Sequence, residues 1–117
     1  MGRRSLRFRR RIEVRRTVRS GRSFESALGR VVWLRVVSPQ ESRVLFVVST
    51  KVSKRSTARN RIRRQLSEAL RRFWRQRLFP VAAVIFVHPR VAAMPSRERN
   101  ALAVELAERL AALTGRR

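Results

Sequence analysis

The spacing of hydrophobic residues near the start of the chain predicts a short basic helix. Within residues 10–20, apolar side chains recur at near-helical spacing. They are Ile12, Val14 and Val18. Gly21 then stands where the C-terminus of a helix favours glycine. Arg3–Arg11 precede this helix as a loose arm in which we expect disorder.

Two runs after this helix have the composition and alternation of β-strands. In Arg30–Val37, successive side chains point to opposite faces, so every second residue shares a face. The face that we expect to be wetter, because it carries an arginine, consists of Val31, Trp33 and Arg35. Arg43–Ser49 is the second run, and residues 38–42 between them are turn formers. Together these segments predict a hairpin.

The second half of the chain predicts a helix, a strand and another helix. Ser56 or Thr57 is placed to cap a helix that runs to about Trp74. Its buried stripe would consist of Ala58, Ile62, Leu66, Ala69, Leu70 and Phe73. Val81–Val87 is continuously apolar, which is typical of a strand covered on both faces. A last amphipathic helix begins at residues 95–96, with an apolar side made of Leu102, Leu106, Leu110 and Leu113.

These elements predict an α/β (α+β) sandwich with the order α-β-β-α-β-α around a central sheet. The chain has 117 residues, about the length of one domain. We therefore expect a single domain over residues 10–114, preceded by a basic disordered arm, residues 1–9, and followed by a tail, residues 115–117.

The charge of the chain predicts a polyanionic partner. There are 30 lysines and arginines against 7 acidic residues, which gives a net charge of +23. Only Lys51 and Lys54 are lysines. The remaining cations are arginines, whose planar guanidinium groups bind phosphate in a bidentate manner and stack on bases. This composition favours a nucleic acid, and RNA in particular, over an acidic protein.

Other features of the composition limit the possible functions. The chain has no cysteine, so disulfides and thiolate metal sites are excluded. Its apolar runs are far shorter than the roughly 20 residues that span a bilayer, so we expect no membrane partner. The lack of cysteine permits a reducing compartment, and the cytoplasm is the location that we expect. The acidic residues are scattered glutamates, which form neither a two-metal nuclease site nor a triad. We therefore predict no catalytic residue and no metal site in the protein itself.

The densest cluster of cations lies at the middle helix. Between Lys51 and Arg77 there are eleven cations and one acid, Glu68. A helix face that is merely solvated normally mixes both signs, so this one is interpreted as a phosphate-binding face. The predicted RNA-binding residues are Lys51, Lys54, Arg55, Arg59, Asn60, Arg61, Arg63 and Arg64.

Two further side chains have both a functional and a structural interpretation. Trp33 could stack on a base beside Arg35, as in proteins that bind single-stranded RNA, or lie in the core, and the sequence leaves both open. His88 is the only histidine, and at a strand end it is more often structural than a ligand or an acid–base group.

Arg59–Arg64, preceded by a basic loop and by a strand ending at Ser49, strongly resembles the signature of the bacterial ribonuclease P protein subunit. The resemblance extends to the leading basic helix with a following glycine, a Ser-Lys-Lys-like segment at Ser49–Lys51, and a Glu-Ala pair at residues 68–69. It covers roughly residues 7 to 113. An Arg-Asn-Arg triplet alone would be weak in so arginine-rich a chain, but this order of elements is specific.

The resemblance implies an accessory role in tRNA maturation. A large catalytic RNA with bound Mg²⁺ would cleave the 5′ leader from precursor tRNA, and the protein would bind both RNAs without binding a cofactor alone. The residues implied to contact the catalytic RNA are Arg59, Asn60, Arg61, Arg63 and Arg64. A cleft between the first helix and the open sheet face would hold the leader, with Val14, Val18, Val31, Trp33, Arg35 and Ser49. The family fold is ribosomal protein S5 domain 2-like, with a left-handed β-α-β crossover that general rules disfavour.

The chain departs from the family pattern at several positions. Val14 and Val18 stand where many members have phenylalanine, so Trp33 is a candidate replacement for stacking. Ser67, Thr50 and His88 occupy positions where basic residues are common, and the loop before Arg59 is one residue longer than usual. The departures affect individual leader contacts more than the overall function.

Three rival functions remain. A ribosomal or ribosome-assembly protein shares the basic helix but does not require the ordered set of Ser49, Lys51 and Arg59–Arg64. A nuclease acting without an RNA subunit lacks a carboxylate cluster. A membrane-active cationic peptide is disfavoured by the apolar strand Val81–Val87, which indicates a folded core.

Overall fold

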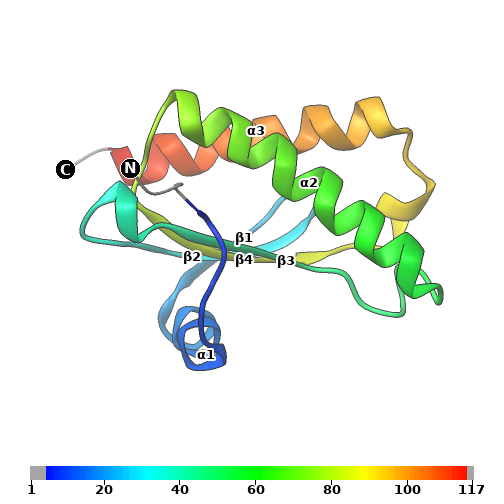
Figure 1. Cartoon of the computed structure of the whole chain (residues 1–117), viewed down its shortest axis with the longest axis horizontal. Helices are drawn as coiled ribbons and strands as arrows, with labels where there is room; N and C mark the ends of the chain where they lie inside the picture. Colours follow the sequence, from blue (N-terminus) through cyan, green and yellow to red (C-terminus); the bar gives the residue numbers. More distant parts are fainter. Residues whose placement is uncertain (1–4, 116–117) are drawn as a thin grey trace.

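The computed structural model describes residues 5–115, and in these it forms a four-stranded sheet with helices on both faces (Figure 1). The elements are α1 (Arg11–Ser20), β1 (Arg22–Glu25), β2 (Gly29–Arg35), β3 (Arg43–Val47), α2 (Ser56–Gln76), β4 (Val81–Val87) and α3 (Ser96–Gly115). Two short 3-10 helices, Pro39–Glu41 and Pro89–Ala93, lie in the connections. Helices α2 and α3 cover one face of the sheet, and α1 crosses the other. The sandwich expected from the sequence is confirmed.

The strand order is β1-β2-β4-β3, which corrects the predicted hairpin. We expected β2 and β3 to pair, but β4 lies between them, antiparallel to β2 and parallel to β3. The hairpin is instead formed by β1 and β2. Strand β1 was not predicted because its four residues are mostly exposed and polar, so the element order is α-β-β-β-α-β-α. The central position of β4 explains its continuously apolar sequence.

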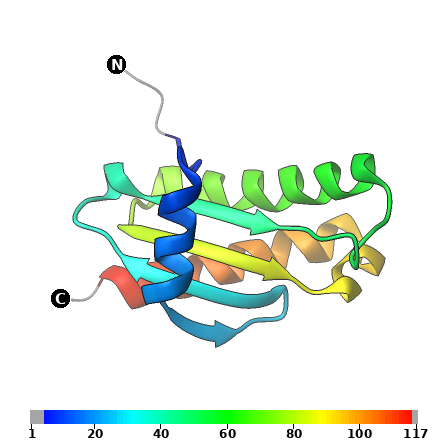
Figure 2. The same ribbon diagram turned by 90° about the horizontal axis from the view of Figure 1, so that it is seen from below.

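The connection from β3 through α2 to β4 crosses over in the left-handed sense. Figure 2 views the sheet from the α1 side, with β3 and β4 pointing the same way and α2 behind them. The rare handedness implied by the resemblance is therefore present. It places α2 along the outer edge of the sheet beside β3.

The main core lies between the sheet and the pair α2 and α3. Helix α2 contributes the predicted Ile62, Leu66 and Leu70, all buried. It also buries Trp74, expected only as the end of the helix, and the Trp74 Nε1 donates a hydrogen bond to the Phe79 carbonyl at 3.0 Å. The predicted members Ala58, Ala69 and Phe73 are only partly buried.

Helix α3 packs through small residues rather than through a leucine stripe alone. Leu106 and Leu110 are buried as predicted and Leu102 is partly buried, but Leu113 is 41% exposed. The buried side is completed by Ala103, Ala107, Ala111 and Thr114. Alanines at four-residue spacing let α3 approach its neighbours closely, and Leu113 lies outside the buried stripe that these residues form.

The two predicted helix ends differ in detail from the structure. Arg55, rather than Ser56 or Thr57, is the N-cap of α2, and no side chain caps it. Gly21 follows α1 with φ −76°, so glycine is not needed there for a left-handed conformation. It is needed for space, because a Cβ atom at Gly21 would lie 2.7 Å from the Val32 Cγ1.

The segment before α1 differs from the expected loose arm. Leu6 is buried, and its carbonyl accepts a hydrogen bond of 2.6 Å from the Val44 N–H at the outer edge of β3. Leu6 therefore holds this segment against the edge strand β3, and residues 1–4 of the predicted arm fall outside the described residues. In residues 5–115 no helix combines the length and apolar composition needed to cross a membrane.

Candidate nucleic-acid interface

The exposed face of α2 carries the cluster of cations predicted from the sequence. Arg61, Arg63 and Arg64 are exposed, and so is Asn60. The Arg63 guanidinium donates to the Asn60 Oδ1. Within the part of the chain that the structure describes, Arg61 and Arg64 have no side-chain partner. Their charges are therefore directed at solvent or at a bound anion.

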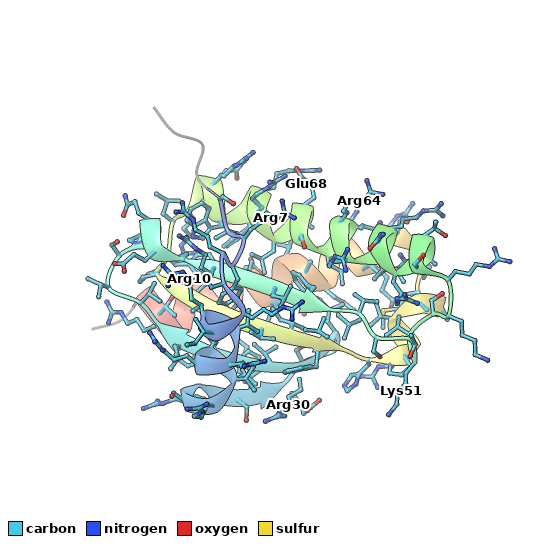
Figure 3. The ribbon with its side chains drawn as sticks, turned by 60° about the horizontal axis from the view of Figure 1, so that its bottom comes forward. Arg7, Arg10, Arg30, Lys51, Arg64 and Glu68 are labelled. Carbon is cyan, nitrogen blue, oxygen red and sulfur yellow. The ribbon has the colours of Figure 1, made fainter. Side chains whose placement is uncertain are left out.

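The first arginine of the triplet has a different environment. Arg59 is half-buried, and its Nη1 donates to the carbonyls of Ser53 and Lys54 at 2.9 and 3.0 Å. These bonds join α2 to the basic loop, residues 49–55, which is also anchored by buried Val52. Arg59 thus positions the loop, while Lys51 at the loop surface stays exposed (Figure 3).

Replacing Arg59 with alanine should loosen the basic loop. The carbonyls of Ser53 and Lys54 would lose their charged donor, and such bonds contribute about 1.5–3 kcal/mol. We expect faster amide hydrogen exchange and protease cleavage within residues 50–55, with the core strands unchanged. Arg59→Lys should restore part of the protection, because the ammonium group can donate to both carbonyls. Equal exchange in Arg59→Ala and the unmodified protein would contradict this role.

A groove of about 1180 Å³ lies between the segment before α1 and helix α2. We call it the arm–helix groove. One wall is residues 6–11, the other is the cationic side of α2, and β3 contributes to the floor. Figure 3 shows Arg7 on the first wall with Arg64 and Glu68 on the second. The predicted RNA-binding residues that line it are Asn60, Arg61, Arg63 and Arg64.

The face of β2 that was predicted to be open and to hold the leader is buried. Val31 and Trp33 are 0% and 9% exposed and belong to the core under α2 and α3. Of the two interpretations of Trp33, the structure therefore supports the core residue over the stacking platform. Arg35 shares their parity and is exposed at the end of the strand.

The opposite face of the sheet is the one beside α1. Strand pairing places Arg30 of β2, Phe86 of β4 and Val47 of β3 in one row across this face. Arg30 is exposed, and Phe86 and Val47 are half-buried. This row offers an aromatic ring beside a cation, the combination expected at Trp33 and Arg35. The sequence could not show which face of β2 is open, because both faces carry apolar residues. It could not single out Phe86 either, because this residue lies in a continuously apolar run.

The other predicted leader residues are not brought together in one place. Val18 is half-buried on α1, whereas Val14 is half-buried and lines the arm–helix groove. Ser49 is exposed beyond β3, and its Oγ accepts a hydrogen bond from the Lys51 N–H at 3.3 Å. Val14 and Val18 therefore lie on the α1 side of the sheet, away from Val31 and Trp33 in the core.

His88 has a structural partner. Its Nε2 lies 3.1 Å from the Glu25 Oε1, which links the end of β4 to the end of β1. Among residues 5–115 no three His, Cys, Asp or Glu side chains are grouped so that they could hold a metal ion.

Comparison with known proteins identifies the family. The family model described as Ribonuclease P matches residues 3–111, which includes every strand and most of α3. The fold is similar to the Thermotoga maritima RNase P protein, with a TM-score of 0.73, 19% identity, and coverage of 88% of this chain and 96% of that one.

A Staphylococcus aureus RNase P protein is similar too, with a TM-score of 0.69, 14% identity, and coverage of 92% and 95%. No curated protein matches the chain. At these identities the solved structures establish the fold, and the family model, which spans nearly the whole chain, establishes the family. The chain therefore belongs to the ribonuclease P protein family, and is the protein subunit of a ribonucleoprotein endoribonuclease that acts in the 5′ processing of tRNA with an RNA partner.

Proposed function

We propose that this chain binds the catalytic RNA through the exposed side of α2 and the basic loop, and that the RNA, with bound Mg²⁺, cleaves precursor tRNA in the bacterial cytoplasm. The observation that carries the proposal is the set of cations on one side of α2. Among the cations predicted to bind RNA, only Arg59 and Arg63 use their side chains in a hydrogen bond or ion pair within the described residues. The assigned residues are Lys51, Lys54, Arg55, Asn60, Arg61, Arg63 and Arg64, with Arg59 in a positioning role.

The physical basis is counterion release. Each phosphate neutralised by a cation frees condensed counterions, so binding is strong, salt-dependent and weakly selective for sequence. That kind of binding suits a subunit that must act on many precursor tRNAs. The protein would supply affinity, whereas Mg²⁺ would be held by the RNA.

The experiment that tests the proposal is cleavage of a precursor tRNA by a bacterial ribonuclease P RNA at low Mg²⁺, with and without the protein. We expect cleavage at the mature 5′ end only when the protein is present, because its cations offset the repulsion between the two RNAs. If the RNA is bound but cleavage is not restored, the protein is a general RNA binder, and ribosomal RNA is the next ligand to test.

We also propose that the 5′ leader lies on the sheet face beside α1. Phe86 would stack on a base and Arg30 would bind a phosphate, with Val18 of α1 at the side of the path. The support is the row of Arg30, Phe86 and Val47 established by strand pairing. Proteins that bind single-stranded nucleic acid commonly combine an aromatic platform with cations in this way.

Replacing Phe86 with alanine should reduce the affinity gained from a long leader. Stacking of one base contributes about 1–3 kcal/mol, which corresponds to about fivefold or more in affinity. The measurement is the ratio of dissociation constants for precursors with long and short leaders. Val37→Ala, at a side chain that is 92% exposed in a distant loop, is the control. An unchanged ratio for Phe86→Ala would refute this placement of the leader.

A further inference from the structure

We propose that the arm–helix groove is a second RNA site, which takes an unpaired segment of the catalytic RNA with one base stacked on Phe8. The inference rests on the proposed function, because the α2 wall of the groove includes Asn60, Arg61, Arg63 and Arg64, which are assigned there to the catalytic RNA. It adds a second wall and an aromatic platform from the segment before α1. Neither was among the residues predicted to bind RNA.

Both walls of the groove carry arginines. Those from the N-terminal segment and α1 are Arg7, Arg9, Arg10 and Arg11, and those from α2 are Arg61, Arg63, Arg64 and Arg71. The single acid in the lining, Glu68, is bound to Arg71 and so offsets only that charge. The guanidinium groups of Arg7, Arg9 and Arg11 are exposed and make no hydrogen bond or ion pair in the described residues. Next to this wall, the Glu13 carboxylate accepts hydrogen bonds from the backbone N–H groups of Arg9 and Arg10 at 3.3 and 3.2 Å. Two facing rows of arginine, in which the arginines outnumber the acids, attract a polyanion that runs between them.

The groove also contains an aromatic ring that lies outside the hydrophobic core. Phe8 is half-buried in the lining, yet it is not packed against the hydrophobic core. The aromatic pair found in residues 5–115 joins Phe73 and Phe79 and does not include Phe8. A half-buried ring between rows of arginine is the arrangement on which unpaired bases stack.

The size and chemistry of the groove favour an unpaired strand over a duplex. In a duplex the bases are already stacked on one another, so a flat base face is not presented to Phe8. The volume of about 1180 Å³ exceeds the roughly 300–1,000 Å³ of small-molecule pockets, which leaves room for more than one nucleotide.

The position of the groove favours the catalytic RNA over the leader. It lies at the outer edge of the sheet, between residues 6–11 and α2, where the hydrogen bond from Val44 to Leu6 holds the N-terminal wall against β3. The row containing Arg30 and Phe86 is instead on β2 and β4, inside the sheet. The two sites are therefore separable by substitution.

The test is binding of the full-length protein to a bacterial ribonuclease P RNA without precursor tRNA. We expect Phe8→Ala and Phe8→Leu to weaken binding about fivefold or more, since both remove the aromatic face. Phe8→Tyr should bind like the unmodified protein. Ile12→Ala is the control, because Ile12 is an exposed apolar residue of α1 that does not line the groove.

Other outcomes would overturn the inference in distinguishable ways. Unchanged binding for Phe8→Ala, or full binding for Phe8→Leu, would show that no base stacks there, while the proposed function would stand. A Phe8→Ala variant that changes only the ratio between long-leader and short-leader precursors would assign the groove to the leader instead. Failure of the unmodified protein to bind the catalytic RNA would refute the proposed function itself.

Discussion

Replacing Arg61 and Arg64 together with alanine should weaken binding to the catalytic RNA by about a hundredfold or more at moderate salt. Both guanidinium groups project from α2 without a side-chain partner in the described residues, so each is free to bind a phosphate. A hydrogen bond to a charged group contributes about 1.5–3 kcal/mol, and 1.4 kcal/mol corresponds to tenfold in affinity. Removing one such bond at each of the two positions gives the expected effect.

The salt dependence of binding gives a second measurement for the same variant. A plot of log K against log salt concentration should become less steep by about 0.7–0.9 for each phosphate that the variant no longer neutralises. Arg75→Ala with Arg97→Ala is the matched control, because it removes two exposed arginines that do not line the arm–helix groove. If the control pair lowers affinity and slope as much as the test pair, net charge rather than a defined surface governs binding.

Arg59 should behave differently from these two arginines. Two of its hydrogen bonds go to the Ser53 and Lys54 carbonyls, so its replacement acts first on the basic loop and only then on the RNA. The Arg-Asn-Arg triplet therefore combines a positioning residue with two residues that are exposed to solvent. Sequence alone assigned all of its arginines to phosphate binding because it contains no information about the loop carbonyls.

Periodicity predicted the helices and the central strand well because their burial is one-sided or complete. Ile62, Leu66 and Leu70 recur on one side of α2, and Val81–Val87 is apolar throughout because it lies between two strands and under helices on both faces. Strand β1 gave no such signal, because an edge strand with exposed residues has little apolar surface to bury.

The faces of β2 could not be assigned from its own sequence. Val31 and Trp33 on one side and Val32 on the other are all buried, so the alternation that normally marks the wet face is absent. The strand has one arginine near each end, Arg30 and Arg35. They lie on opposite faces, so each would mark a different face as exposed. The tertiary structure determines which face is exposed, because α1 covers only part of one face of the sheet, whereas α2 and α3 cover the other face.

The segment before α1 is held by one tertiary contact that local composition does not reveal. Arginine-rich residues 7–11 predict a loose arm, but buried Leu6 and its hydrogen bond with Val44 hold the segment at the edge of β3. Covering this edge also limits pairing with other chains. The same contact creates the arm–helix groove, so the least predictable segment forms one wall of the proposed second site.

Replacing Trp74 with alanine should lower the free energy of unfolding by about 3–5 kcal/mol, as expected for a large buried aromatic side chain. Trp74 is 1% exposed between α2 and the sheet, and its Nε1 donates to the Phe79 carbonyl. The substitution removes both the packing and the donor to this carbonyl. Urea unfolding followed by circular dichroism would measure the change.

Two variants separate the contributions of packing and hydrogen bonding at this site. Trp74→Phe keeps much of the apolar contact but leaves the Phe79 carbonyl without its indole donor, so it should cost less than Trp74→Ala and about 1–3 kcal/mol. Arg75→Ala, at the next and exposed position, should change stability by about 0.5 kcal/mol or less. A decrease below about 1 kcal/mol for Trp74→Ala would contradict the packing of α2 against the sheet. Because α2 carries the candidate RNA-binding face, we expect the Trp74→Ala variant to bind RNA at temperatures at which α2 stays packed on the sheet. Binding should be lost at the temperature at which the helix detaches.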